Sequence, residues 1–355
     1  MLDSFYVRNF RLFEELSIER LGRLNLIVGL NNSGKSCLLE ALYLYGTQAD
    51  IPALYHMVEM RGEDWELQSM GPGEIIREEA HPFRSFFPGY RFPETQEPDL
   101  LVGPRQDADC IGLRVSREQD SRHQNDLIIT KSKGTSTLGT LYLEQEIERY
   151  ARFGGSRHLK PADETKAIQF VPTKHQPVSA FFDLWDHINL NPETREKVFD
   201  ALRLVDPNFR EVVMINQIRL PTPIMLYKNN ETKVPLASLG DGINHLFRII
   251  LSLFNAAGGM LLIDEFENGL HYSVQPKVWD LIFKMAHELD IQVFVTTHSW
   301  DCIEAFREAS KDNDKDAMLF HLGRSHRTSD KGQIVVIDYD HDDLMLSTKS
   351  DLDVR

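Results

Sequence analysis

An eight-residue segment, GLNNSGKS at residues 29–36, restricts the fold of this chain more than any other part of its sequence. It matches the pattern GxxxxGK(S/T) in full and connects the apolar run LNLIVGL with the amphipathic segment SCLLEALYLYG. Backbone N–H groups of such a loop point inward and cradle phosphate oxygens at the positive end of the following helix. The segment therefore predicts a strand, a phosphate-binding loop and a helix, which form the first half of a βαβ unit.

The side chains of this loop predict how a nucleotide is held. Lys35 is expected to reach the β- and γ-phosphates and to act in catalysis, and the Ser36 hydroxyl is expected to ligate Mg²⁺. Further contacts to the nucleotide are expected from the loop and from the first turn of the helix. The residues concerned are Gly29, Asn31, Asn32, Ser33, Gly34 and Cys37.

A second signal is the run MLLIDE at residues 260–265, in which four apolar residues precede two carboxylates. At the carboxyl end of a central strand, both acids would lie beside the phosphate-binding loop. Asp264 is expected to hold Mg²⁺. Glu265 is expected to orient or deprotonate the water that attacks the γ-phosphate, which makes it a predicted catalytic residue.

The order of predicted elements indicates the fold class. From Ala237 onward, amphipathic helices alternate with apolar strands, which is typical of a parallel sheet covered by helices. We expect an α/β P-loop fold with a mixed or parallel sheet flanked by helices and an antiparallel β subdomain near the N-terminus. Residues 1–46 and 211–355, the latter with an acidic tail, are expected to form the nucleotide-binding core. Residues 47–210 are expected to form an inserted lobe.

The predicted lobe is partly β-rich and partly helical. We expect irregular antiparallel structure between Thr47 and Gly139, because this range mixes Pro, Gly, aromatic and polar residues. A helical stretch is expected around YLEQEIERYARF, followed by a strand at AIQFVPT. AFFDLWDHI and PETREKVFDALRLVD predict a pair of amphipathic helices, the second opened by Pro192.

Composition and charge exclude several classes of function. The 39 Lys and Arg residues against 54 Asp and Glu residues give a net charge of −15, so no overall field attracts DNA or an anionic membrane. The first residues carry charges where a signal peptide needs an apolar run, and no stretch approaches the roughly 18 apolar residues of a membrane span. Three cysteines without CxxC spacing predict neither a disulfide framework nor a zinc site. We therefore expect a cytoplasmic protein.

Taken together, these residues resemble the ABC-type ATPase head shared by SMC proteins, RecF and the OLD-like ATPases. Four further segments carry the resemblance. SLGDG at 238–242, before a predicted helix, resembles the signature loop, and ENGLH at 267–271 resembles the D-loop of OLD-like proteins. TTHS at 296–299 resembles the switch-histidine segment, and Asn9-Phe10-Arg11 resembles the NFR-like opening of RecF and OLD-like sequences.

The resemblance implies ATP and Mg²⁺ as cofactors and a homodimer with composite ATP sites. Ser238 and Gly240 of one subunit, with Asp241 beside them, would cap the ATP bound by the P-loop of a second subunit. The residues support this independently, because a glycine loop that opens a helix offers a second anion-binding N-terminus. His298 would read the γ-phosphate as a catalytic residue. Arg11 would either approach the nucleotide or lie on the surface of an edge strand.

The signature loop reads SLGDG rather than the transporter-like SGGQ. The roles of its serine and glycines are therefore transferred from the family, whereas the role of the residue that follows them is not. Gln169 and Gln176 are both candidates for a Q-loop glutamine. The residues between Ser36 and Ser238 contain no heptads, so we expect no long coiled-coil arm. The segment after Ser299 is too short for the Toprim nuclease domain of full OLD-type proteins.

We therefore expect a stand-alone ATPase head that controls a separately encoded effector, such as the nuclease of a bacterial anti-phage or DNA-repair system. Two other functions stay open. A RecF-like DNA-binding repair protein would need a basic groove, and a transporter ATPase subunit is disfavoured by the signature loop and by the lobe. The candidates for the basic groove are Arg149, Arg152, Arg157, Lys160 and the turn from Arg324 to Arg327.

Overall fold

The computed structural model describes most of the 355 residues. Within the described part, strands form two six-stranded sheets and one three-stranded sheet. The described residues are 1–63, 81–94, 98–105, 109–120, 123–143, 167–173, 180–216, 221–228, 230–311, 316–325 and 332–346.

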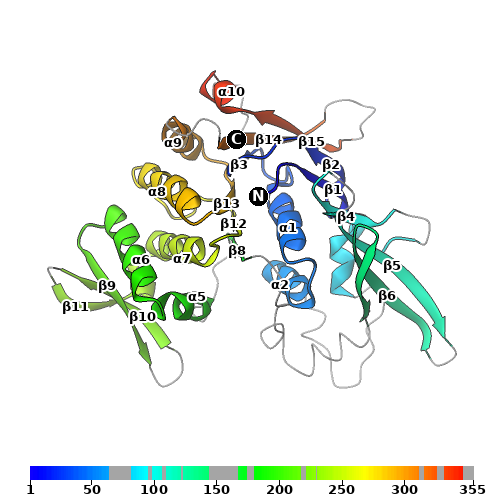
Figure 1. Cartoon of the computed structure of the whole chain (residues 1–355), viewed down its shortest axis with the longest axis horizontal. Helices are drawn as coiled ribbons and strands as arrows, with labels where there is room; N and C mark the ends of the chain where they lie inside the picture. Colours follow the sequence, from blue (N-terminus) through cyan, green and yellow to red (C-terminus); the bar gives the residue numbers. More distant parts are fainter. Residues whose placement is uncertain are drawn as a thin grey trace.

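The core sheet runs through the middle of the molecule (Figure 1). From β14 to β8 its strands are parallel, and β15 pairs antiparallel with β14 at one edge. In spatial order the strands are β15 (Ile334–Tyr339), β14 (Ala317–Arg324), β3 (Leu24–Val28), β13 (Gln292–Thr296), β12 (Met260–Ile263) and β8 (Ile168–Val171).

Hydrophobic clusters cover both faces of this sheet, which is why its central strands are continuous apolar runs. On β13, Val293 and Val295 belong to one cluster and Phe294 to the other. The first cluster lies beneath a group of helices on one side of the sheet (Figure 1). These helices are α5 (Ala180–Asn189), α6 (Pro192–Val205), α7 (Asp241–Asn255), α8 (Gln275–Glu288) and α9 (Trp300–Ser310).

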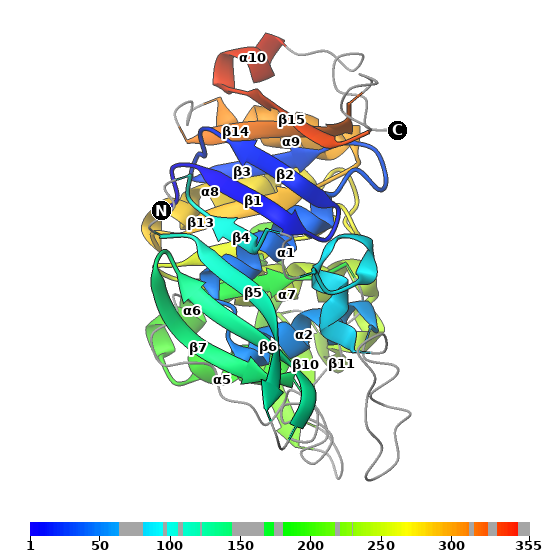
Figure 2. The same cartoon turned by 90° about the vertical axis from the view of Figure 1, so that its right-hand side faces the viewer.

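The opposite face carries α1 (Lys35–Gly46), α2 (Ile51–Arg61) and the second six-stranded sheet. Every strand pair of that sheet is antiparallel, which confirms the predicted antiparallel β subdomain (Figure 2). In spatial order the strands are β2 (Phe13–Ile18), β1 (Phe5–Phe10), β4 (Leu100–Gly103), β5 (Ile111–Asp120), β6 (His123–Lys133) and β7 (Ser136–Tyr142).

The three-stranded sheet lies ahead of the signature loop in the chain. It consists of β9 (Phe209–Asn216), β10 (Pro221–Tyr227) and β11 (Asn230–Pro235). A 3₁₀ turn, η6 (Leu236–Leu239), connects β11 directly to α7. The start of α7 is therefore fixed from both sides, by a sheet before it and by its own packing on the core.

The helices and strands predicted for the second half of the chain are confirmed. The pair α5 and α6 is present, and α6 begins as its sequence indicates, with Pro192 in its first turn. The Asn191 side chain caps α6 by accepting from the N–H groups of Glu193 and Thr194, at 3.0 and 3.2 Å. The core is therefore built from local signals that the sequence carries.

The range 47–139 is more regular than the irregular antiparallel structure expected there. It contains a regular helix, α2, whose N-terminus is capped because the Asp50 side chain accepts from the N–H of Ala53 at 2.8 Å. Gly62, with φ 68°, closes the other end. Strands β4 to β7 extend the N-terminal sheet, and β8 joins the core sheet. The lobe boundaries stay a prediction, but the range 47–210 contributes to both large sheets.

Other elements complete the chain. Two 3₁₀ turns, η2 (Pro82–Phe86) and η3 (Pro88–Tyr90), follow α2, and α10 (His341–Leu346) follows β15. Part of the predicted acidic tail is thus ordered in β15 and α10. The helix expected at 142–153 lies outside the described residues, apart from Tyr142, which ends β7, and Leu143. None of the described helices combines the length and apolarity needed to cross a bilayer.

Candidate active site

The phosphate-binding loop lies between the end of β3 and the start of α1. Gly34 is the N-cap of α1 with φ 96°, a left-handed conformation that a β-carbon would strain, and it offers no side-chain cap. The first N–H groups of α1 are therefore not capped by a side chain at Gly34. The Lys35 ammonium folds back along the loop and donates to the carbonyls of Gly29 and Leu30, at 2.8 and 2.9 Å.

Lys35 is a desolvated cation facing carboxylates. Burial lowers the pKa of its ammonium, and the charges of Asp264, Glu265 and Glu267 oppose this by raising it. An ammonium held in such surroundings interacts with an anion more strongly than one in water does, because the local dielectric is low. The position suits a group that binds phosphate oxygens.

The carboxylate of Asp264 gathers three hydroxyl groups from different elements. Ser36 Oγ donates to it from α1, at 3.0 Å from both Oδ1 and Oδ2. Thr296 Oγ1 donates to Oδ1 at 2.6 Å, and Thr173 Oγ1 donates to Oδ2 at 2.9 Å. Asp264 is buried, with 8% of its surface exposed. The structure thus joins Ser36 and Asp264, the two residues predicted to bind metal, and adds Thr173 and Thr296.

This set of atoms fits Mg²⁺, which prefers a few hard oxygen ligands together with phosphate oxygens. Ser36 and Asp264 would hold the ion directly. Thr173 and Thr296 would orient the carboxylate, as outer-shell hydrogen bonds do at metal sites. The donor chemistry is therefore consistent with the expected cofactor.

Glu265 follows Asp264 in a strained backbone conformation. Its φ is 52°, in the left-handed region that non-glycine residues rarely adopt, and its N–H donates to Thr296 Oγ1 at 2.8 Å. Burial raises the pKa of the Glu265 carboxyl, and the neighbouring charge of Asp264 raises it further. Both effects make Glu265 a better proton acceptor when ionised, as a general base requires.

His298 lies at the end of β13 and contacts the D-loop rather than a hydrophobic core. Its Nδ1 is 3.0 Å from Glu267 Oε1, and its backbone N–H donates to the same oxygen at 2.9 Å. Thr297 Oγ1 donates to Glu267 Oε2 at 2.7 Å. A protonated His298 would lower the pKa of Glu265, opposing the effect of burial. His298 therefore belongs to the same electrostatic cluster as the predicted catalytic residues.

The predicted signature residues lie on the other side of the core sheet. Ser238, Gly240 and Asp241 are exposed at the start of α7, and α7 covers the face opposite to α1 (Figure 1). Gly240 is the N-cap of α7 and supplies no side-chain cap. Asn244 Nδ2 instead fixes the turn by donating to the Gly240 carbonyl at 2.7 Å. The signature loop thus presents the N-terminal end of α7 to solvent.

Arg11 does not lie on the surface, which corrects that alternative, and its approach to the nucleotide stays a prediction. It is 7% exposed in the turn after β1. Its Nε is 2.6 Å from Glu40 Oε2 and its Nη1 is 2.9 Å from Glu63 Oε1. A buried arginine needs such partners, because an unpaired buried charge is costly. Cys37 is also buried, and its Sγ accepts from Arg61 Nη2 at 3.5 Å.

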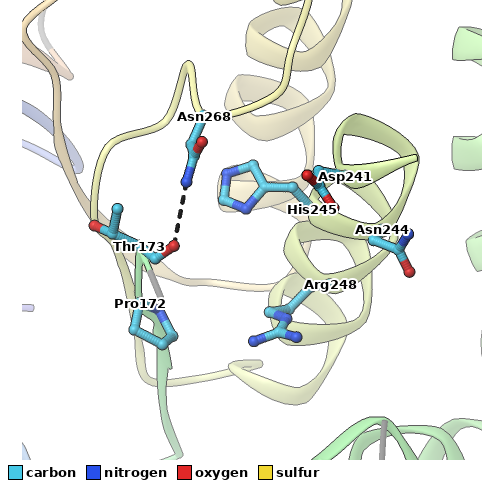
Figure 3. Close-up of a pocket in the computed structure, with 7 residues that line it drawn as sticks. All are labelled: Pro172, Thr173, Asp241, Asn244, His245, Arg248 and Asn268. Carbon is cyan, nitrogen blue, oxygen red and sulfur yellow. Dashed lines mark hydrogen bonds between the residues drawn. The ribbon is translucent and has the colours of Figure 1, made fainter. Parts of the chain in front are cut away.

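A pocket of about 370 Å³ adjoins the site on the side of α7 (Figure 3). Arg248 extends from α7 toward Pro172, and its guanidinium lies 4.9 Å from the ring centre of Phe181. Burial lowers the pKa of Arg248 to about 10. Burial, aided by Arg248, lowers the pKa of His245 to about 4. The pocket is lined by Pro172, Thr173, Asp241, Asn244, His245, Arg248 and Asn268.

Sequence reasoning predicted Asp241 as a nucleotide-binding residue but missed Asn244, His245 and Arg248. These three residues recur with Asp241 at helical spacing, in a segment that the sequence indicated only as a helix. That spacing was the available signal. Thr173 carried no motif of its own, since its role follows from the pairing of β8 with β12.

Some predicted residues cannot be located. Gln169 lies on β8, whereas Gln176 falls outside the described residues. The same holds for most of the predicted basic groove, of which only Arg324, at the end of β14, is described. The residues outside the described ranges are Arg149, Arg152, Arg157, Lys160 and Arg327.

The chain matches two family models. Residues 121–301 match the model described as "AAA domain, putative AbiEii toxin, Type IV TA system". Residues 1–96 match the model described as "AAA ATPase domain".

Similar proteins agree with these families. An ATP/GTP phosphatase from Helicobacter pylori is 24% identical over 344 residues, covering 88% of this chain and 90% of that protein. The DNA replication and repair protein RecF from Halothermothrix orenii is 48% identical over 46 residues, covering 13% of this chain and 12% of RecF. Among solved structures, the Smc head bound to the C-winged helix domain of ScpA has a TM-score of 0.50 at 13% identity, covering 97% of this chain and 99% of that one. The last comparison shows an SMC-head fold.

Proposed function

The chain belongs to the AAA-domain family that its residues 121–301 match, and from this premise we propose that it is a Mg²⁺-dependent ATPase that dimerises head to head around ATP. Its fold is that of an ABC-type ATPase head of the RecF and SMC class. Both families and the Helicobacter pylori relative support ATP hydrolysis. We further propose that dimerisation controls a partner protein.

The observation that carries this proposal is the contact between Ser36 and Asp264. The hydroxyl of the P-loop helix and the carboxylate at the end of β12 lie 3.0 Å apart, with Lys35 beside them on the loop carbonyls. An ordinary glycine turn next to an acidic strand end has no reason to bring a serine, a lysine and an aspartate together. Binding of a nucleotide phosphate with Mg²⁺ explains all three.

Each residue has a defined task in this mechanism. Lys35 exchanges its loop carbonyls for phosphate oxygens, and the N–H groups at the start of α1 bind the same phosphates. Mg²⁺ held by Ser36 and Asp264 would neutralise the phosphate charge. Glu265 orients a water and accepts its proton, and its raised pKa suits that role.

The exposed signature loop supports the dimer. Ser238 and Gly240 directly precede α7, and α7 and α1 lie on opposite sides of the core sheet (Figure 1). This arrangement favours a role for both residues at the P-loop of a second subunit. In a two-fold dimer the signature loop of each subunit would face the P-loop of the other. Two such composite sites would enclose two ATP molecules.

The partner is proposed to be a separately encoded effector of a bacterial defence or repair system. The family description refers to a toxin–antitoxin system, which supports a role beside a second protein. An Smc head of similar fold has been solved with a domain of ScpA, so such heads do present a surface to a partner.

ATP turnover tests this proposal. The purified wild type should hydrolyse ATP only with Mg²⁺, and Lys35→Ala should lose nucleotide binding because the phosphates lose their fixed cation. Glu265→Gln should bind ATP, hydrolyse it about 10²–10⁴-fold more slowly, and accumulate as a dimer measured by light scattering. Normal ATP binding by Lys35→Ala, or a Glu265→Gln variant as active as the wild type, would refute the assignment.

A further inference from the structure

The carboxylate of Glu267 receives three contacts from the segment that carries the switch histidine. Oε1 lies 3.0 Å from His298 Nδ1 and 2.9 Å from the backbone nitrogen of His298, and Oε2 accepts from Thr297 Oγ1 at 2.7 Å. The Glu267 side chain is only 12% exposed, whereas that of His298 is 46% exposed. Glu267 of the D-loop therefore holds Nδ1 and the backbone of His298, while the rest of the imidazole ring stays accessible.

The geometry decides which ring nitrogen carries a proton. A carboxylate oxygen is an acceptor only, so Nδ1 at 3.0 Å must donate to it. Nε2 is then the nitrogen that stays available on the other side of the ring. Without such a partner the imidazole is not held in this tautomer, because the hydrogen bond made by one ring nitrogen sets the protonation of the other.

Glu267 is the third acid of this cluster, beside Asp264 and Glu265. Its charge raises the pKa of Glu265, as like charges do, and raises that of Lys35, as an opposite charge does. The backbone N–H of His298 and the Thr297 hydroxyl need only an acceptor, which a neutral side chain could also supply. The contact with Nδ1 is the one that an ionised carboxylate fixes, because it has no proton to donate to the ring.

We propose that Glu267 is a positioning residue for His298, which fixes the proton on Nδ1 and directs Nε2 toward the nucleotide. The proposal rests on the proposed ATPase function and deepens it. Glu267 does not touch the reacting atoms in this account. It acts through His298, and because it lies in the D-loop, it ties the orientation of the histidine to the position of that loop.

Two substitutions of Glu267 that keep the length of its side chain distinguish positioning of His298 from simple packing. Glu267→Gln keeps an oxygen that accepts from Nδ1, whereas Glu267→Met keeps the side-chain length and leaves only a thioether sulfur, which is a weak acceptor. The ¹⁵N resonances of His298, assigned by comparison with His298→Ala, report its tautomer in the protein without nucleotide. ATPase kinetics on the same proteins report kcat and KM separately.

We expect Nδ1 to be protonated in the wild type and in Glu267→Gln, and Nε2 to be protonated in Glu267→Met. The Met variant should lose about 10–100-fold in kcat with KM for ATP changed less than about twofold, and the Gln variant should recover most of kcat. A Met variant that keeps the wild-type tautomer, or Gln and Met variants with equal kcat, would overturn the proposal. If the Met variant does not fold, the Gln variant decides the question, because a proton on Nε2 of His298 in that variant would overturn the proposal. A wild type without ATPase activity would refute the proposed function, while the tautomer measurement still decides the role of Glu267.

Discussion

Gly242 and Gly269 lie in direct backbone contact, so the start of the signature helix touches the D-loop with no side chain between them. A β-carbon built on Gly242 would lie 2.1 Å from the carbonyl oxygen of Gly269, far closer than any real contact. Gly269 has φ +72°, and a β-carbon there would be 2.9 Å from the nitrogen of Gly242. The signature loop and the D-loop are therefore joined within one subunit.

Replacing Gly242 with Ala should separate these loops without disturbing the P-loop. We expect nucleotide affinity within about twofold of the wild type, because α1 and Lys35 are on the other face of the sheet, and a loss of about tenfold or more in ATPase activity. Titration with a fluorescent ATP analogue and steady-state hydrolysis measure the two quantities. Gly139→Ala is the matched control, since a β-carbon there meets nothing closer than 3.9 Å. Equal activity of Gly242→Ala and the control would contradict the coupling.

Loss of the Thr173 hydroxyl should weaken Mg²⁺ binding at the site. It donates to Asp264 Oδ2 at 2.9 Å, and loss of an outer-shell bond of this kind typically lowers metal affinity about 10–100-fold. Thr173→Val should therefore require about tenfold more Mg²⁺ for half-maximal ATPase activity, whereas Thr173→Ser should resemble the wild type. A Mg²⁺ titration of activity measures this. Identical curves for the Val and Ser variants would show that Thr173 has no role in the metal site.

The centre of the site could be predicted because its motifs each lie within one short stretch of sequence. Contacts between segments that are distant in the chain could not be predicted. Lys35 and Ser36 lie in one loop, and Asp264 ends an apolar strand, so parallel pairing alone brings them together. Thr173 reaches Asp264 only because β8 pairs with β12, and the sequence AIQFVPT does not indicate which strand will lie beside it. The burial of Arg11 was missed for the same reason, since Glu40 and Glu63 become its partners only after the chain has folded.

The fold was predictable to a similar degree. Alternating helices and apolar strands after Ala237 indicated the core sheet, because each element there follows a regular hydrophobic period. The helix α2 was missed although Asp50 and Gly62 mark its ends, since its apolar residues do not form one clear stripe. In the sheet formed by β1, β2 and β4 to β7, most pairs join strands that follow one another closely in the chain. The pairing of β1 with β4, as of Tyr6 with Gly103, joins distant segments, which local patterns do not specify.

Acid should destabilise the protein through His81. Burial, with a smaller contribution from Arg84, lowers the pKa of His81 to about 3 from 6.5, and its Nδ1 accepts from the N–H of Phe83 at 3.1 Å. The unfolded chain binds a proton at this residue below about pH 6.5 while the folded chain does not, so the free energy of unfolding falls as the pH falls. Between pH 7.5 and pH 5 the loss is about 2 kcal/mol.

His81→Asn removes this titration and keeps an acceptor for the N–H of Phe83. Urea unfolding between pH 7.5 and 5 should therefore show a smaller decrease in stability for the variant, by about 2 kcal/mol over this range, with most of the difference below pH 6.5. His245, whose pKa is lowered to about 4, contributes a decrease of the same sign in both proteins. Parallel pH profiles for wild type and variant would show that His81 is not buried as a neutral group.

Mixing two inactive variants tests most directly whether Lys35 of one subunit and Ser238 of another enclose the same ATP. Lys35→Ala disables the P-loop side of a site, and Ser238→Arg disables the signature side. In a mixed dimer both lesions fall in one site and leave the other intact, so an equimolar mixture should regain about a quarter of wild-type ATPase activity. Lys35→Ala mixed with Asp264→Asn is the control and should stay inactive, because both lesions affect the P-loop side. A Lys35→Ala and Ser238→Arg mixture as inactive as its two components would contradict the shared site.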